Sequence, residues 1–208
     1  GGGVVGTNAI RMALGMGADV TVIDRSVKRL TELDEQYGGR LRTLYSTADA
    51  IEEAASHADL IIGAVLIAGA SAPKLVTRDM LKKLKPGTVM VDVAIDQGGC
   101  FETSRPTTHA DPTYVIDQIV HYCVANMPGA VARTATMALT NATLPYIQRL
   151  AEGDLDTLLQ DDPHFANGLN IRAGKITHPA VAAALSSAAT EPSATPLAEP
   201  AQAMGNAA

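Results

Sequence analysis

The first six residues of the chain carry three glycines at the spacing of a dinucleotide-binding loop. Gly1, Gly3 and Gly6 fit the pattern Gly-x-Gly-x-x-Gly. In such a loop the glycines allow a tight turn, a close approach of the backbone to a pyrophosphate and close packing of a helix on a strand. The free N–H groups at the start of the next helix then face the phosphate charge. By itself the spacing is weak evidence, because adjacent glycines also form flexible linkers.

An acidic residue follows this loop at the distance expected of a ribose ligand. Asp24 ends the apolar run 20–23 and lies 18 residues (24 − 6) after Gly6, close to the roughly 20 residues of dinucleotide-binding domains. A carboxylate there accepts hydrogen bonds from both ribose hydroxyls and repels a 2′-phosphate, which favours NAD over NADP. Arg25 is a contrary sign, since an adjacent arginine can accommodate that phosphate, and a helix-capping role for Asp24 stays open.

Strands and helices must alternate to position these residues. Apolar runs that are buried on both faces, each followed by a short helical pattern, indicate a doubly wound parallel α/β sheet of the Rossmann type. The expected strands are 20–23, 41–45, 60–65 and 89–94, with shorter extended pieces at 114–116 and 122–124. The expected helices are 7–16, 26–36, 47–56, 77–84, one or two within 130–150, and 155–159.

The strand that normally precedes the glycine loop is missing from this pattern. In the strand order 3-2-1-4-5-6 that strand is central, and without it two neighbours would each keep unpaired backbone groups, at about 1–3 kcal/mol per group. We therefore expect the sequence to begin inside a domain. Residues 1–128 are predicted to form an NAD(H)-binding domain without its first strand. Residues 129–180 would be helices that complete a second, substrate domain built mainly from an upstream part, and 181–208 a disordered tail.

Composition excludes several function classes. The formal net charge is −6 and the 16 Lys and Arg residues are scattered, which argues against nucleic acid as a partner. No apolar run reaches the roughly 18 residues of a membrane span. Two cysteines make no disulfide framework, and the five histidines show no metal-ligand spacing. A cytoplasmic protein without a metal is the expectation.

Longer motifs in the second half of the chain are more specific than the glycine loop. Residues 91–102 (VDVAIDQGGCFE), 104–108 (SRPTT) and 126–129 (NMPG) closely resemble the alanine dehydrogenases, as does the region from 63 to 76. The resemblance extends from Gly1 to about Thr177. The NAD-binding subunit of proton-translocating transhydrogenase shares the fold and the paired glycines, but these strings are closer to alanine dehydrogenase.

This resemblance implies reversible oxidative deamination of L-alanine to pyruvate and ammonia with NAD, by a two-domain subunit in a homo-oligomer, commonly a hexamer. It also implies that a catalytic His and the substrate-binding Lys and Arg lie upstream, so that this chain alone is inactive. A non-catalytic NAD-binding fragment and a transhydrogenase subunit stay as alternatives. The cofactor-binding residues that the resemblance implies are Gly1, Gly3, Val4, Val5, Gly6, Asp24, Arg29, Ser46, Val65, Leu66, Val93, Ala94, Ile95, Asp96, Arg105, Val124, Ala125, Asn126 and Met127.

Asp96 is the predicted catalytic residue. It follows the carboxyl end of an apolar strand, where open α/β sheets place their ligands. A carboxylate there can position the water that attacks an imine or stabilise a developing cation. The alternative is a structural carboxylate that binds the backbone of the Gly98-Gly99 turn.

Other chemically capable side chains are interpreted as structural. Cys100 could be a nucleophile, but the sequence pairs it with no base, so a buried thiol is the better interpretation, and Cys123 is expected in the core. His121 is expected to be packed or capping.

Overall fold

The computed structural model describes residues 1–66 and 72–188. Strands and helices alternate from Val4 to Gln97, as the sequence pattern predicts. They are α1 (Val4–Gly15), β1 (Val20–Asp24), α2 (Val27–Tyr37), β2 (Leu41–Tyr45), α3 (Ala48–His57), β3 (Leu60–Gly63), α4 (Arg78–Leu81), β4 (Val89–Asp92) and the 3-10 helix η1 (Ile95–Gln97), and they are followed by β5 (Thr113–Ile116) and β6 (Ile119–Tyr122).

Serine and threonine side chains cap the N-termini of three helices. Ser26, Thr47 and Thr77 each accept a hydrogen bond from a backbone N–H of the first turn of α2, α3 and α4, which supplies a partner that the helix itself cannot provide. Gly38 then ends α2 in the left-handed conformation. The helix expected at 77–84 is confirmed only as the single turn of α4, because 82–85 continue as turns that end before Pro86.

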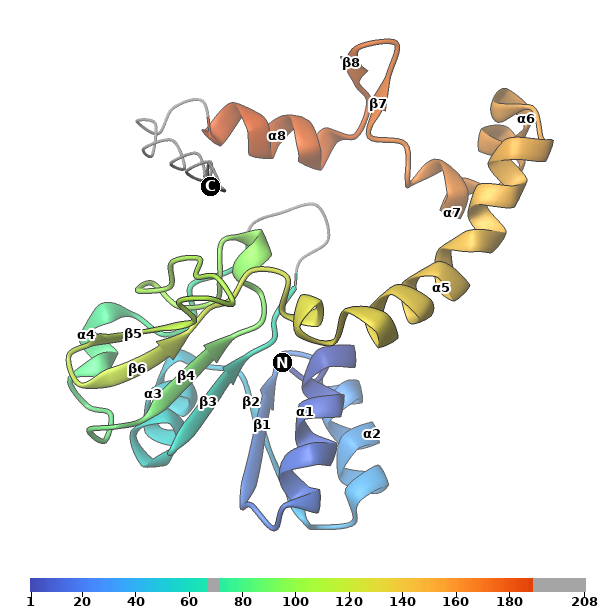
Figure 1. Ribbon diagram of the computed structural model, residues 1–208. Helices are drawn as coiled ribbons and strands as arrows, with labels where there is room; N and C mark the ends of the chain where they lie inside the picture. The colour runs from blue at the N-terminus through green and yellow to red at the C-terminus, as the bar shows by residue number, and fades with distance from the viewer. Residues whose placement is uncertain (67–71, 189–208) are drawn as a thin grey trace, which may run out of the picture.

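Two groups of hydrogen-bonded strands form the sheet region (Figure 1). Strands β1 and β2 are paired in parallel, and the second group has the order β3-β4-β6-β5. Strands β3, β4 and β6 are parallel. The predicted doubly wound α/β class is therefore confirmed, with helices α1 and α2 beside the first group and α3 and α4 beside the second.

Each group of strands has its own apolar core. Leu33 and Tyr37 of α2, Ile10 of α1 and Val22 of β1 are buried together at the first group. At the second, Leu81 of α4 packs with Met90, Phe101 and Ile119. Each core packs helix residues against strand residues of its own group, and so holds the helices on the sheet region.

The edges of β1 and β3 that face each other are not hydrogen-bonded to one another. The chain's first residues lie between the ends of these two strands (Figure 1). In the order 3-2-1-4-5-6 this is the position of the strand that precedes the glycine loop. Both facing edges keep backbone groups that no strand within residues 1–66 and 72–188 pairs.

The far edge of the second group departs from the sequence prediction. Strands β5 and β6 form an antiparallel hairpin, and β6 ends at Tyr122 instead of occupying 122–124 as predicted. The turn between them, Asp117–Gln118, has positive φ at both residues, 49° and 65°. Such a turn joins twisted strands, but it usually contains Asn-Gly or Asp-Gly, so the sequence carried no hairpin signal here.

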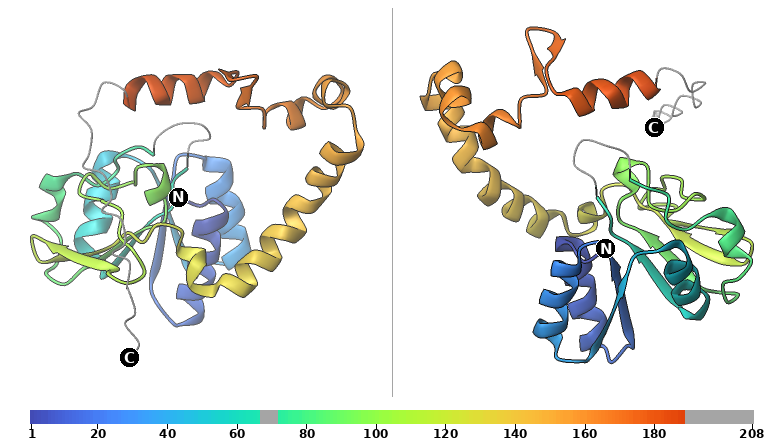
Figure 2. Two further views of the ribbon diagram at one scale, coloured as in Figure 1. Left: turned by 45° about the horizontal axis from the view of Figure 1, so that its top comes forward. Right: turned by 180° about the vertical axis from the view of Figure 1, so that it is seen from behind.

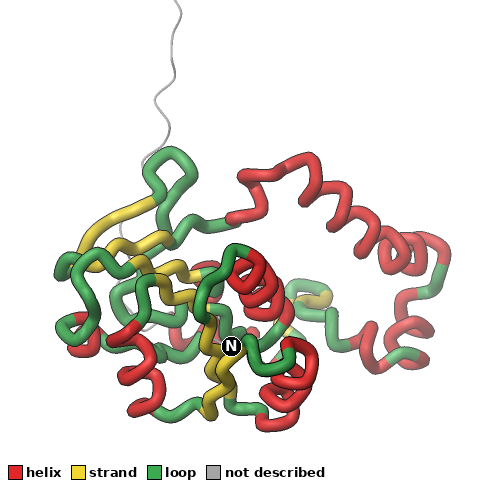
Figure 3. Tube along the Cα trace, turned by 90° about the horizontal axis from the view of Figure 1, so that it is seen from below, coloured by secondary structure: helices red, strands yellow, loops and turns green. Residues whose placement is uncertain are grey.

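A helical arm follows the sheet region and stands away from it (Figures 2 and 3). Its elements are η2 (Met127–Val131), α5 (Ala132–Glu152), α6 (Leu155–Asp161), α7 (Pro163–Ala166), the hairpin β7 (Ile171–Arg172) and β8 (Lys175–Ile176), and α8 (Pro179–Ala188). No side chain described beyond Val124 is buried.

The predicted disordered tail from residue 181 is wrong for its first eight residues, which lie in α8. The Ala-rich run after Pro179 has high helix propensity, and the sequence interpretation gave more importance to its lack of bulky side chains. The remainder, 189–208, lies outside the described residues. Within the part of the chain that the structure describes, no helix has the length and apolar character that crossing a membrane requires.

Candidate functional site

The glycine loop leads directly into α1. Helix α1 begins at Val4, and its first backbone hydrogen bond runs from the N–H of Thr7 to the carbonyl oxygen of Gly3, at 2.9 Å. The N–H groups of Val4, Val5 and Gly6 therefore have no acceptor within the helix. No side chain caps this end either, so it presents free donors and the positive end of the helix dipole to an anion.

Gly6 must be a glycine because the loop folds back onto it. A Cβ atom at Gly6 would lie 1.8 Å from the carbonyl oxygen of Gly1. Gly1 is itself in contact with Ala64 and Val65, since a Cβ there would lie 2.8 Å from the Ala64 oxygen. The glycine loop thus packs against the segment that follows β3. Two predicted parts of the site, the glycine loop and Val65, meet there.

Asp24 binds the glycine loop from the end of β1. Its Oδ2 accepts a hydrogen bond from the N–H of Gly2 at 2.7 Å, and its Oδ1 accepts one from the N–H of Ser26 at 2.8 Å. Burial acts to raise the pKa of Asp24, but the backbone hydrogen bonds of Ser26 and Gly2 favour the charged form, and the pKa lies below its usual value. Asp24 is therefore a fixed carboxylate anion beside the loop.

Arg29 also holds the glycine loop. Its Nε donates to the carbonyl oxygen of Gly2 at 2.7 Å, and its guanidinium also donates to Thr7 Oγ1 at 2.7 Å and to Glu32 at 2.8 Å. Gly2 is thus bound through its N–H by Asp24 and through its carbonyl by Arg29. Sequence reasoning assigned Arg29 to the ribose region and missed Thr7, whose role depends on this tertiary contact.

Ser46 and Leu66 complete this first group of candidate site residues, which also contains the glycine loop, Asp24, Arg29 and Val65. The N–H of Ser46 donates to the backbone oxygen of Asp24 at 3.0 Å, so the residue lies beside the ribose-binding candidate. Leu66 follows Val65 and exposes 62% of its surface. It is the last residue described before the gap at 67–71.

A second group of candidate site residues, distinct from the two groups of strands, follows β4. The N–H of Val93 donates to the carbonyl oxygen of Gly63 at 2.9 Å, and Ala94 and Ile95 are buried. Asp96 lies on η1 and is exposed. Among residues 1–66 and 72–188 its carboxylate has no hydrogen-bond partner, so it is free to contact a substrate.

Cys100 connects the two groups of candidate site residues through its contact with Val65. Its thiol is buried and donates to the carbonyl oxygen of Val65 at 3.5 Å. Burial raises the pKa of Cys100 above its usual value, which disfavours the thiolate that a nucleophile needs. The interpretation of Cys100 as a buried structural thiol is confirmed, and Cys123 is buried as well.

Arg105 is supported by a stack of aromatic rings. Its guanidinium carbon lies 4.0 Å from the centre of the Tyr114 ring, and that ring stacks on His121 at 4.9 Å. His121 is fully buried, contacts Thr103 Oγ1 through Nε2 at 2.8 Å, and has a pKa that burial lowers. His121 is therefore a packed, neutral histidine, as predicted, while sequence reasoning missed Tyr114.

The last predicted segment runs beside the Arg105 loop. Thr107 and Val124 form a parallel bridge, and the N–H of Ala125 donates to the oxygen of Thr107 at 3.1 Å. Asn126 adopts the left-handed conformation, with φ 52°, and Met127 begins η2. The structure thus places Val124 and Ala125 beside Thr107, two residues after Arg105 in the same loop.

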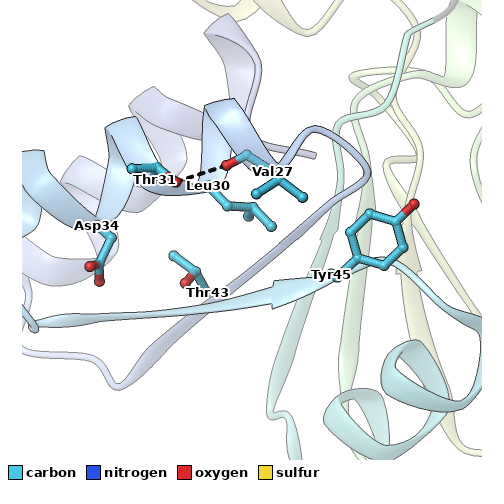
Figure 4. A pocket seen from close by; sticks show the side chains of 6 residues that line it. All are labelled: Val27, Leu30, Thr31, Asp34, Thr43 and Tyr45. Carbon is cyan, nitrogen blue, oxygen red and sulfur yellow. Dashed lines mark hydrogen bonds between the residues drawn. The ribbon is translucent and has the colours of Figure 1, made fainter.

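A groove on the surface is lined by residues that belong to neither group. Figure 4 shows α2 facing β2 across it, and its lining residues are Val27, Leu30, Thr31, Asp34, Thr43 and Tyr45. None of them is a predicted site residue. Leu30 and Tyr45 are, however, next in sequence to Arg29 and Ser46, so the groove adjoins the first group of candidate site residues without including any of them.

The fold and these two groups define a doubly wound α/β domain with a dinucleotide-type glycine loop, an acidic residue at the end of the next strand and a second loop group beyond it. The sequence profile described as "Alanine dehydrogenase/PNT, C-terminal domain" matches residues 1–179. The chain belongs to this family.

Relatives in the comparisons support the same assignment. The chain is 68% identical over 184 residues to an alanine dehydrogenase of Halomonas elongata, which covers 88% of this chain and 50% of the relative. A solved L-alanine dehydrogenase superposes with TM-score 0.78 at 49% identity, covering 90% of this chain and 52% of that one. A transhydrogenase from Sinorhizobium meliloti superposes with TM-score 0.66 at 27% identity, over 86% and 48% of the two chains. The chain thus spans about half the length of the relatives it matches.

Proposed function

We propose that the full-length protein that contains this chain catalyses the reversible oxidative deamination of L-alanine to pyruvate and ammonia with NAD. The observation that carries the proposal is the 68% identity to a protein named alanine dehydrogenase over 88% of the chain. The identity of 27% to the transhydrogenase structure is much lower, which favours the dehydrogenase over the transhydrogenase alternative.

The residues of the first group fit a dinucleotide with an unphosphorylated ribose. The free N–H groups at Val4, Val5 and Gly6 suit a pyrophosphate. The Asp24 carboxylate already binds two backbone N–H groups, and each oxygen keeps acceptor capacity for a ribose hydroxyl. Its negative charge opposes a 2′-phosphate, so NAD is the proposed cofactor.

The second group fits the reacting end of the cofactor. NAD supplies the acceptor for the hydride that leaves the substrate Cα, and water then adds to the imine carbon before ammonia departs. Asp96 is exposed at the end of β4 and is proposed to orient that water and to accept its proton. Arg105, which lies over the Tyr114 ring, and residues 124–127 are proposed to border the nicotinamide.

The arm is proposed to belong to a second domain. Helix α5 has 21 residues and buries none of them, although an isolated helix gains little stability without tertiary packing. Residues 129–180 would complete a substrate domain with the upstream half, beside the NAD-binding domain of 1–128. The apolar side chains of α5 that are available for this packing are Met137, Leu139, Leu144, Tyr146, Ile147 and Leu150, each 45–65% exposed.

The remaining parts of the proposal follow from family membership. The upstream half would supply the acid/base histidine and the Lys and Arg that bind the substrate carboxylate. The subunits would assemble as a homo-oligomer, with a hexamer as the expected size, in the cytoplasm. The 208-residue chain alone would bind NADH without turnover.

The test is alanine-dependent reduction of NAD by the protein expressed from the first in-frame start codon upstream. The expected result is NADH formation in step with pyruvate, with NADP giving a much lower rate. Asp96→Asn should lower kcat by about 10²-fold or more, in the range of a lost acid/base group, with little change in the KM for NAD. NAD reduction that does not require L-alanine would contradict the proposal, and an Asp96→Asn variant with normal kcat would remove Asp96 from it.

A further inference from the structure

A second carboxylate lies close to Asp96 in the sequence but is fully buried. Asp92 is the last residue of β4 and exposes 0% of its surface. A buried carboxylate is costly unless several donors satisfy it. Four donors reach this one, three backbone N–H groups and the hydroxyl of Ser104.

The two oxygens of Asp92 bind different parts of the chain. Oδ1 accepts from the N–H of Ala94 at 3.1 Å, where the chain leaves β4. Oδ2 accepts from the N–H groups of Cys100 and Phe101, at 2.8 and 3.3 Å, and from Ser104 Oγ at 2.6 Å, where the chain returns. The carboxylate thus closes the base of the turn 94–100, on which Asp96 lies.

The turn is tightly closed around this carboxylate. The N–H groups of Gln97 and Gly99 both donate to the carbonyl oxygen of Ala94, at 2.9 and 3.0 Å. Gly99 has φ +78°, and a Cβ on it would lie 2.6 Å from Asp92 Oδ2. From the other side, the Lys74 ammonium donates to the carbonyl oxygens of Gly98 and Gly99.

Asp96 depends on this turn for its position. Its exposed carboxylate has no side-chain or backbone partner within residues 1–66 and 72–188, so the backbone alone fixes where it stands. We infer that Asp92 is a positioning residue for the reaction: by holding both ends of the turn 94–100, it sets the place of Asp96 relative to the substrate. This inference rests on the proposed function of Asp96.

The test replaces Asp92 by Asn in the full-length protein. An amide keeps the shape but turns one oxygen into an N–H donor, which must face a backbone N–H of the turn. A displacement of about 1 Å at a reacting group lowers rates by up to about 10²-fold. We expect kcat for alanine oxidation to fall about 10- to 100-fold, while the KM for NAD changes less than about twofold, because the adenosine-side contacts are on β1 and α1.

Two further measurements separate positioning from general damage. Hydrogen exchange of the amides in 94–101 should become faster in Asp92→Asn, while that in β1 and α2 stays unchanged. Asp79→Asn is the matched control: it removes an exposed carboxylate that pairs with Lys82 on α4 and should leave kcat and exchange unchanged.

Each outcome decides the inference. A folded Asp92→Asn protein with kcat within about twofold of wild type overturns it, as does a parallel loss of kcat and NAD affinity. If Asp92→Asn does not fold, Ser104→Ala removes one donor only and should lower kcat about three- to tenfold, and an unchanged kcat in that variant overturns the inference. If the wild-type protein does not oxidise alanine, the proposed function fails, and the exchange of 94–101 alone then decides whether Asp92 holds the turn.

Discussion

Replacing Gly6 by Ala should damage the glycine loop while leaving α1 intact. Alanine is the better helix former, so the substitution is favourable for the helix itself. The added Cβ, however, would lie 1.8 Å from the carbonyl oxygen of Gly1 and 2.9 Å from its carbonyl carbon. Non-bonded atoms rest at about 3.5–4.0 Å, so the loop must move away from the helix by more than about 1 Å.

The size of the effect follows from the hydrogen bonds that this movement breaks. The loop and the free N–H groups at the start of α1 can no longer both face one pyrophosphate. A hydrogen bond to a charged group contributes about 1.5–3 kcal/mol, so the loss of one such bond weakens NADH binding about 10- to 150-fold. Gly15→Ala in the same helix is the matched control, because a Cβ there meets nothing within 4 Å. It should stabilise the protein by about 0.5–1 kcal/mol and leave NADH binding unchanged.

The assay is a titration of the full-length protein with NADH, followed by nicotinamide fluorescence, with circular dichroism as a check on folding. We expect the dissociation constant of Gly6→Ala to rise at least about tenfold and that of Gly15→Ala to match wild type. A folded Gly6→Ala protein that binds NADH as tightly as wild type would refute the reasoning that the loop packs on Gly6 to form the phosphate site.

Three further predictions concern single residues. Because the pKa of Asp24 is lowered in the folded state, its contribution to stability is present above the unfolded value of about 3.9 and is lost as the pH falls through the folded pKa. Urea unfolding of Asp24→Asn should therefore show a weaker loss of stability than wild type as the pH falls below about 4, and identical pH profiles would contradict this. Gly99→Ala should destabilise the protein by more than the roughly 1 kcal/mol of a positive-φ penalty, because its Cβ would meet the Asp92 carboxylate at 2.6 Å; Gly87→Ala, with φ +87° and open space, should show that penalty alone in the same melting experiment. Cys100 is 0% exposed and burial raises its pKa, so a thiol reagent at pH 8 should modify it only as fast as the protein opens, and rapid labelling of the native protein would show that the thiol is accessible.

The sequence predicts the elements best where local signals agree. The apolar runs that became β1 and β2 flank α2, which has a Ser26 cap and ends at Gly38, and their bounds were predicted within one residue. The hairpin β5–β6 was not foreseen, because Asp117 and Gln118 adopt positive φ without a glycine. Short apolar runs also give no information about strand direction, which depends on the partner strand.

Residues of the candidate site were predictable from the sequence where they end strands. Asp24 follows β1's apolar residues and Asp96 follows β4, and ligands bind at the carboxyl ends of such strands. The supporting residues Thr7 and Asp92 were not, because their roles come from tertiary contacts. Thr7 Oγ1 accepts a hydrogen bond from Arg29, 22 positions away, and Asp92 appeared only as part of a longer motif. An acidic residue at the end of an apolar strand was the available signal for Asp92, since burial of a charge requires several donors.

The measurement that tests the account most directly is the initial rate of NADH oxidation by the full-length protein with pyruvate and ammonium. Each reactant is left out in turn, and NADPH is the cofactor control. The account predicts turnover only when pyruvate, ammonium and NADH are all present, with alanine as the product. Oxidation of NADH without ammonium, or binding of NADH with no turnover under any of these conditions, would contradict the assignment of this chain to a working alanine dehydrogenase.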